Sequence, residues 1–414
     1  MLFHFSAYGF LKNQRYFEPF MLLFLMSRGM SYTQIGLLLG FRELCTALLE
    51  IPSGALADLY GRKRSMIFSF CLYIFSFAGF GLSGRNFWQL FAAMILFAAG
   101  DAFRTGTHKA LIFSWLRRHN RLEEKTKIYG YTRSWSKTGS AVSIAVAVWL
   151  MTTIGDYAAV FFISIIPYVL GLVNFLFYPK ELDDHTQGRV TMAAAAGHVK
   201  QAVLSSFTRP AQRRLLVESI CFEGFFKAVK DYIQPIIQSF AVVLPVLAVF
   251  DFKDRSSIGI GIVYFLLHIV SAAGSRMSHK IVDMQGSEDK AAQWVWKASF
   301  LLYAAMIPFF ITRQYSIAVI LFVLVHILQN IWRPVLISRF HLFSTDRDGA
   351  TVLSIESQAK SFGAMIFAPI AGAVVDYVKI HGWGGEFWPV AVLGAGISAV
   401  MLVYGRRKNA DAAV

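Results

Sequence analysis

The sequence predicts an all-α polytopic membrane protein, and three observations support this fold class. Hydrophobic residues occupy 56% of the 414 positions, charged residues only 16%, and the mean hydropathy is +0.51. Apolar runs of about twenty residues, enough to cross roughly 30 Å of hydrocarbon, recur along the whole chain. The runs do not alternate polar and apolar residues as barrel strands would, so each is expected to be a helix.

Twelve such runs are expected to be transmembrane helices. In order they lie at 4–26, 35–57, 65–82, 88–109, 130–152, 157–178, 215–245, 257–275, 293–311, 315–337, 350–375 and 387–404. With the N-terminus inside, 22 Lys and Arg residues fall in cytoplasmic segments and 6 in external loops. This asymmetry follows the positive-inside rule and predicts cytoplasmic termini in a cytoplasmic (inner) membrane. The net charge of +15 therefore follows from topology and does not indicate a nucleic-acid partner.

The first expected span contains charges at a depth where lipid makes them costly. Its stretch "GFLKNQRYFEP", residues 9–19, holds Lys12, Arg15 and Glu18. The pattern returns in the seventh span as "GFFKAVKDYIQP", where Lys227 and Lys230 match Lys12 and Arg15. Charges inside a span usually face a cavity or a partner, so these residues are candidates for a functional site.

Two further pairs of spans repeat in the same order. "DAFR" (101–104) in the fourth span is echoed by "NIWR" (330–333) in the tenth, and "SWSKT" (134–138) by "SQAKS" (357–361). A tandem duplication of six spans predicts two pseudo-symmetric halves with a binding site between them. The predicted organisation is an N-terminal half at 1–178, a central cytoplasmic loop at 179–214 and a C-terminal half at 215–414 with a short cytoplasmic tail.

The loop between the second and third spans carries a recognisable motif. Residues 54–66, "GALADLYGRKRSM", fit the pattern G-x-L-A-D-x-x-G-R-[KR]. The pattern resembles motif A of the major facilitator superfamily, whose plan of twelve helices in two halves matches the whole chain. The resemblance implies a monomeric secondary transporter that works by alternating access, with a cytoplasmic gate at the motif. The gating residues would be Gly54, Asp58, Gly61, Arg62 and Lys63.

In that family, spans 1, 4, 7 and 10 line the central cavity. Carried over to this sequence, they contribute six basic residues as substrate-binding candidates: Lys12, Arg15, Arg104, Lys227, Lys230 and Arg333. Facing Lys and Arg residues would clamp a small organic or phosphorylated anion. The carboxylates Glu18, Asp101 and Glu223 are the candidates for proton coupling. The alternative is internal pairing, because Arg15 and Glu18, like Asp101 and Arg104, are spaced i, i+3.

Two other functions remain open. A proton-coupled exporter of drugs or cations would use the same three carboxylates to face its substrate, although the fifth span lacks the Gly-Pro signature common in drug–proton antiporters. A membrane-embedded enzyme or sensor has less support, since no HExxH, GxSxG or clustered His and Cys is present. Cys45, Cys71 and Cys221 all lie in apolar runs, so neither a disulfide nor a metal site is expected. The expected partners are a small-molecule substrate, the bilayer and a proton, without a cofactor.

Overall fold

The computed structural model describes residues 1–183, 210–241, 249–341 and 349–411, and all regular elements within these ranges are helical. The expected all-α fold is confirmed for this part of the chain. The expected loop at 179–214 falls largely outside the described residues, so the division into halves at that loop stays a prediction.

In the part of the chain that the structure describes, six helices are long and apolar enough to cross a membrane. They are α4 (Arg62–Leu82), α8 (Tyr157–Leu176), α13 (Phe252–Gln285), α14 (Glu288–Ile311), α15 (Tyr315–His341) and α16 (Gly349–His381). The other expected spans are shorter, broken or more polar: they include α3 (Tyr32–Tyr60), α5 (Phe87–Arg104), α7 (Lys125–Thr153) and α17 (Trp388–Asp411). The count of twelve spans and the cytoplasmic placement of both termini remain predictions.

The chain divides into two compact units. Unit 1 comprises Met1–Gly29 and Arg42–His198, and unit 2 comprises Met30–Phe41 and Val199–Val414. The first turns of α3 thus belong to unit 2, where Asp376 of α16 accepts hydrogen bonds from the backbone N–H groups of Tyr32 (3.0 Å) and Thr33 (2.7 Å). A carboxylate at this position satisfies free N–H groups at the start of α3 and favours its dipole.

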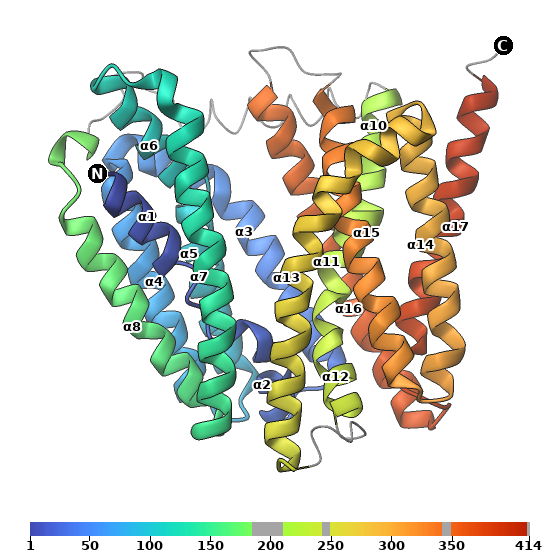
Figure 1. The fold of residues 1–414 in the computed structure, drawn as a ribbon. Helices are drawn as coiled ribbons and strands as arrows, with labels where there is room; N and C mark the ends of the chain where they lie inside the picture. The colour runs from blue at the N-terminus through green and yellow to red at the C-terminus, as the bar shows by residue number, and fades with distance from the viewer. Residues whose placement is uncertain (184–209, 242–248, 342–348, 412–414) are drawn as a thin grey trace. The chain divides into compact units, whose positions relative to one another are not determined.

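In unit 1, α4 packs against both α5 and α8, and α1 (Leu2–Leu11) packs on α7 (Figure 1). The contact between α1 and α7 is close because Gly139 has no side chain. A Cβ atom at Gly139 would lie 2.6 Å from the carbonyl oxygen of Phe10. Stacked and edge-on rings fill the interior, for example Phe17 on Phe161 with ring centroids 4.7 Å apart.

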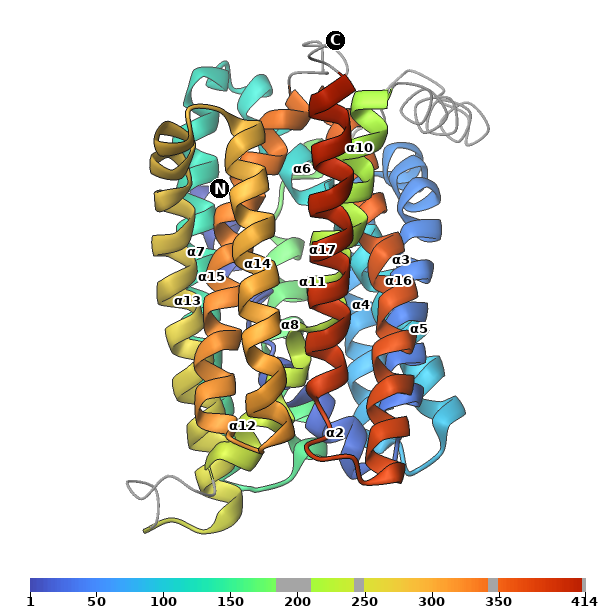
Figure 2. The same ribbon diagram turned by 90° about the vertical axis from the view of Figure 1, so that its right-hand side faces the viewer.

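In unit 2, α14 runs beside α15 and α17, and α13 runs beside α15 (Figure 2). The core between these helices includes the fully buried Trp332, which stacks on Phe222 with ring centroids 4.8 Å apart. Here too a glycine allows a close approach. A Cβ atom at Gly363 of α16 would lie 2.4 Å from the carbonyl oxygen of Ile220.

Three of the expected spans are interrupted. Span 1 leaves the helix after α1 and resumes with the 3-10 turn η1 (Glu18–Phe20) and α2 (Met21–Ser27). Span 4 breaks at Gly106, where φ is 78°, between α5 and α6 (Thr107–Arg118). Span 7 consists of α10 (Pro210–Glu218), the π-helical η4 (Ser219–Gly224), α11 (Phe225–Val229), the 3-10 turn η5 (Lys230–Tyr232) and α12 (Ile233–Ala241). Breaks at membrane depth require polar partners or a water-filled cavity, and the candidate charges lie beside these breaks.

Candidate functional site

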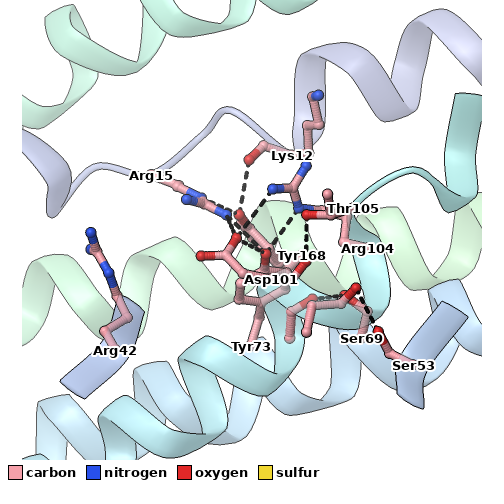
Figure 3. Close-up of polar contacts among 12 residues, drawn as sticks. Lys12, Arg15, Arg42, Ser53, Ser69, Tyr73, Asp101, Arg104, Thr105 and Tyr168 are labelled. Carbon is pink, nitrogen blue, oxygen red and sulfur yellow. Dashed lines mark hydrogen bonds and ion pairs between the residues drawn. The ribbon is translucent and has the colours of Figure 1, made fainter. Parts of the chain in front are cut away.

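A cluster of charges and tyrosines, here named the Asp101 hub, occupies unit 1. It comprises Arg15, Tyr73, Asp101, Arg104 and Tyr168 (Figure 3). One oxygen of Asp101 accepts hydrogen bonds from Arg104 Nη2 (3.1 Å), from Arg15 Nη2 (3.4 Å) and from the Tyr73 hydroxyl. Two guanidinium groups therefore share one carboxylate, and the hub carries an excess positive charge.

The two tyrosines of the hub connect it to the break in span 1. Arg15 Nε donates to the Tyr168 hydroxyl (2.8 Å), which in turn donates to the backbone carbonyl of Lys12 (2.8 Å). Arg104 Nε donates to the Tyr73 hydroxyl at 2.9 Å. Both tyrosine side chains are fully buried, so these hydrogen bonds are shielded from water and hold the chain at the break.

The hub bears on both sequence-based interpretations of the span charges. The ion pair that the i, i+3 spacing allows between Asp101 and Arg104 is present. Arg15 also binds Asp101, whereas Glu18 begins η1 with an exposed side chain. Tyr73 and Tyr168 were not predicted as site residues, because a tyrosine inside an apolar run reads as a packing residue.

A cavity of about 280 Å³ lies beside the hub, also within unit 1. Its wall comes from α1, α6 and α7 and the residues after α1: Tyr8, Gly9, Lys12, Asn13, His108, Ile112, Tyr129, Thr132, Arg133, Ser136, Lys137 and Ser140. Among the described residues, the wall includes three cationic side chains and His108, and no carboxylate. A cleft lined by one sign of charge concentrates ions of the opposite sign.

Lys12 connects the hub to the cavity. Its backbone carbonyl is held by Tyr168, while its side chain is directed away from Asp101 (Figure 3). The ammonium group lies 5.4 Å from the centroid of the Tyr8 ring. His108 stacks on that ring at 3.6 Å, and its Nε2 lies 3.1 Å from the Tyr178 hydroxyl, so the histidine is a buried part of the wall.

The corresponding charges in unit 2 form a second group, here named the Arg333 cluster: Glu223, Gln329, Arg333 and Glu356. Arg333 forms a two-point ion pair with Glu356, one contact of which is 2.9 Å, and its Nη1 lies 3.9 Å from Glu223. Gln329 Nε2 donates to Glu223 at 3.2 Å. Glu223 and Glu356 are only 4% and 1% exposed, and both lie beside Arg333, while Lys360 is a second cation that acts on Glu223.

The two predicted lysines of span 7 also contact partners in unit 2. Lys227 Nζ donates to the hydroxyl of Ser361 at 3.4 Å. Lys230 Nζ forms an ion pair with Asp231 at 2.8 Å. The structure therefore places five of the six basic candidates in polar contacts, and it places Lys12 at a cavity.

Two buried pairs were not predicted from the sequence. Arg339, beyond the end of the expected tenth span, lies inside α15, pairs with the buried Glu218 and contacts Asp289 at 2.8 Å. In unit 1, Arg42 pairs with the buried Glu43 at 2.8 Å. The sequence did offer a signal for the pair of Arg42 and Glu43, because these two opposite charges are adjacent within an apolar run.

The predicted gating residues surround the turn between α3 and α4. Gly61, with φ of 102°, supplies a backbone conformation that other residues rarely adopt. Arg62 donates to Ser114 (3.0 Å), and Lys63 donates to the carbonyl of Tyr178 (2.6 Å) just after the C-terminal end of α8, where a cation is favoured. Gly54 lies in open space, and the side chain of Asp58 falls outside the part that the structure describes.

No group of three or more His, Cys, Asp or Glu residues in the described ranges could hold a metal ion. Helices that can cross a membrane, breaks beside buried charges and a polar cavity together are features of a membrane transport protein. A model of the Major Facilitator Superfamily matches residues 4–292, which is more than half of the chain. The protein therefore belongs to the Major Facilitator Superfamily: it is a multi-pass secondary transporter of a small molecule and not an enzyme.

Comparisons with individual proteins agree with this family. Over 102 residues the chain is 32% identical to the uncharacterized MFS-type transporter YxaM of Bacillus subtilis (strain 168), a match covering 25% of this chain and 24% of that protein. The nucleoside transporter NupG has a similar fold, with a TM-score of 0.76, 12% identity and coverage of 98% of both chains. A D-xylose-proton symporter is similar with a TM-score of 0.65, 14% identity and coverage of 97% of this chain and 95% of that one. At these identities the solved structures show the fold alone.

Proposed function

We propose that the protein transports a small organic or phosphorylated anion across the cytoplasmic membrane by alternating access. The observation that carries the proposal is the cavity in unit 1, whose wall has three cationic side chains and no carboxylate. A cationic wall at membrane depth is expensive unless an anion enters it during function. In this proposal the chain is a monomer with twelve spans, cytoplasmic termini and a cytoplasmic gate at the motif around Gly61.

The other basic candidates have a different part in the proposed cycle. Arg15, Arg104, Lys227, Lys230 and Arg333 all contact carboxylates or hydroxyl groups in this structure. Ion pairs that form in one access state and break in the other provide the two-state element that alternating access needs. We therefore assign these five residues to pairs that exchange partners as the transporter changes state.

Proton coupling, where present, is best supported at Glu223. Protonating Asp101 would weaken contacts to two arginines at 3.1 and 3.4 Å. Protonating Glu223 would weaken a 3.9 Å contact to Arg333, which also holds Glu356, and a hydrogen bond from Gln329 at 3.2 Å. Glu18 is exposed and is the weakest of the three candidates.

The proposed function is tested by thermal unfolding of the purified protein in mild detergent. The panel sets inorganic phosphate and dicarboxylates against lipophilic cations. A ligand at 100 times its Kd should stabilise the protein by about 2.7 kcal/mol. Stabilisation by anions supports the proposal, and stabilisation by cations alone would replace it with the exporter of drugs or cations.

Proton coupling needs a separate experiment in proteoliposomes. Uptake of the stabilising anion is measured with and without an imposed pH gradient. Glu223→Gln should abolish the response to the gradient, while Glu18→Gln should keep it. An unchanged response in Glu223→Gln would show that another group carries the proton. If the unmodified protein did not respond to the gradient, transport would not be coupled to protons.

A further inference from the structure

We propose that Lys12, Arg133 and Lys137 form an anion site within unit 1 that accepts a small hydroxylated dianion. The chemical class includes phosphate monoesters of polyols and hydroxy-dicarboxylates. The inference rests on the proposed function and adds a location, a charge and a substrate class. It also assigns Arg15 and Arg104 to positioning Lys12, without direct contact with the substrate.

The location follows from the cavity wall. Arg133 and Lys137 both come from α7, four residues apart on one helical face, and Lys12 follows α1 on the other side of the cavity. Arg15 and Arg104 are absent from the wall and are bound to Asp101 and the two tyrosines of the hub. The cavity therefore presents three cations that the hub does not use.

Arg133 and Lys137 are both exposed in this structure and line an open cavity, and Lys137 lies far from either end of α7. The helix α7 has 29 residues, and Lys137 lies twelve residues beyond its first, a rise of about 18 Å along the axis. Within the described ranges, neither Arg133 nor Lys137 forms an ion pair. α7 covers the fifth expected span, and a charge inside a span without an opposite charge normally marks a substrate path.

The number of cations in the cavity wall indicates that the substrate carries two negative charges. The cations repel one another, and a monoanion would leave two of the three positive charges uncompensated. A dianion compensates most of the charge, and its oxygens can accept charge-assisted hydrogen bonds from several donors. The volume of about 280 Å³ lies at the small end of the range for ligand pockets, which favours a compact substrate.

Three hydroxyl groups on α7 indicate that the substrate carries hydroxyl groups in addition to its charged oxygens. Thr132, Ser136 and Ser140 line the cavity at intervals of four residues, and each donates its proton to a backbone carbonyl of α7. Because each hydroxyl proton is already donated, these oxygens can accept hydrogen bonds through their remaining lone pairs but have no proton left to donate to an anion. Hydroxyl groups on the substrate would meet this row of acceptors, while its charged oxygens meet the cations.

The test measures binding of three dianions, inorganic phosphate, succinate and malate, to the full-length protein in detergent at constant ionic strength. Acetate and chloride serve as monoanions. We expect the dianions to raise Tm, the monoanions not to, and malate to bind more tightly than succinate because it adds one hydroxyl group. Lys137→Gln and Arg133→Gln should each weaken dianion binding at least tenfold, about 1.4 kcal/mol.

Two further variants keep the test falsifiable. Lys127→Gln removes an exposed cation from the same helix outside the cavity, and it should bind malate like the unmodified protein. Lys137→Arg restores the charge and should recover most of the affinity, which separates loss of the site from loss of the fold.

The outcomes separate the inference from the proposed function. Normal malate binding by Lys137→Gln and Arg133→Gln would overturn this site, while anion transport would stand. If acetate bound as tightly as malate, the inferred preference for a dianion over a monoanion would be wrong. Stabilisation by lipophilic cations alone would overturn both proposals.

Discussion

The Asp101 hub and the Arg333 cluster lie on matching spans of the predicted repeat but arrange their charges differently. In unit 1 one carboxylate, Asp101, binds two arginines. In unit 2 one arginine, Arg333, contacts two carboxylates, Glu356 and Glu223. Arg104 and Arg333 occupy the same place in the predicted repeat, and the two sites differ in what surrounds the arginine.

The difference suggests separate tasks for the two halves. We expect the excess of cations in the Asp101 hub to be relieved by binding an anion, and we expect the buried Glu223, which lies near Arg333 and Lys360, to be the group in unit 2 that binds a proton. The backbone arrangement is similar in both, because Gly139 in unit 1 and Gly363 in unit 2 bring matching helices close together. A duplicated scaffold can thus retain its packing while its charges diverge.

The largest expected effect is the loss of stability when each cluster loses an arginine. Arg333→Met leaves Glu356, which is 1% exposed, without its ion-pair partner. Breaking a buried pair in this way costs about 3–5 kcal/mol. Arg15→Met leaves Arg104 bound to Asp101, so the loss should be nearer the value for hydrogen bonds to a charged group, about 1.5–3 kcal/mol.

Thermal unfolding of both variants checks this difference. The double variant Arg333→Met with Glu356→Gln is the control, because it removes the stranded charge and should recover part of the lost Tm. Equal losses in the two single variants would show that the charge balance of the clusters does not govern their stability.

The next effect concerns the shared packing. Gly139→Ala and Gly363→Ala each place a Cβ atom within 2.6 Å of a backbone oxygen, and neither helix can move without disturbing its neighbours. Overpacking of this kind costs about 1–3 kcal/mol, and the two losses should be similar. Gly54→Ala, where no described residue lies within 4 Å of the added Cβ atom, is the matched control. It should keep or raise its Tm, because alanine favours the helix more than glycine does. A large loss in only one half would weaken the claim of a common scaffold.

Several parts of this comparison could be predicted from the sequence, and others could not. Apolar runs and motif A were sufficient for the all-α fold and the family, since both are local patterns. The contact between Arg15 and Asp101 was not predicted, because it joins two segments 86 residues apart and a spacing rule covers only neighbours on one helix. Arg133 was missed because a cation on one helix shows no sign of the cavity that a second helix completes.

A smaller effect is expected from the tyrosine that holds the break in span 1. Tyr168→Phe removes one hydroxyl that joins Arg15 to the carbonyl of Lys12, and it should lower stability by about 1 kcal/mol. Because Lys12 would be less well positioned, KM for the transported anion should rise while kcat changes little. Tyr157→Phe, a tyrosine at the start of α8 and outside the hub, is the control. A Tyr168→Phe variant with reduced Tm but unchanged KM would leave this tyrosine a purely structural residue.

The smallest effect is expected from an exposed pair in unit 1. Arg121 donates two hydrogen bonds to Glu124, at 2.7 and 2.8 Å, which hold the pKa of the Glu124 carboxyl below its usual range. A lowered pKa in the folded state adds stability above the unfolded pKa, and that stability is lost as the pH falls through the folded value. The pair lies at the 3-10 turn η2 (Leu122–Glu124), which Arg121 directly precedes, outside the spans. Water screens it there, so Glu124→Gln should leave Tm unchanged at pH 7. A clear fall in Tm at pH 7 would mean that exposed pairs also set the stability of unit 1, and the contrast between the hub and the Arg333 cluster could no longer be ascribed to burial of charge.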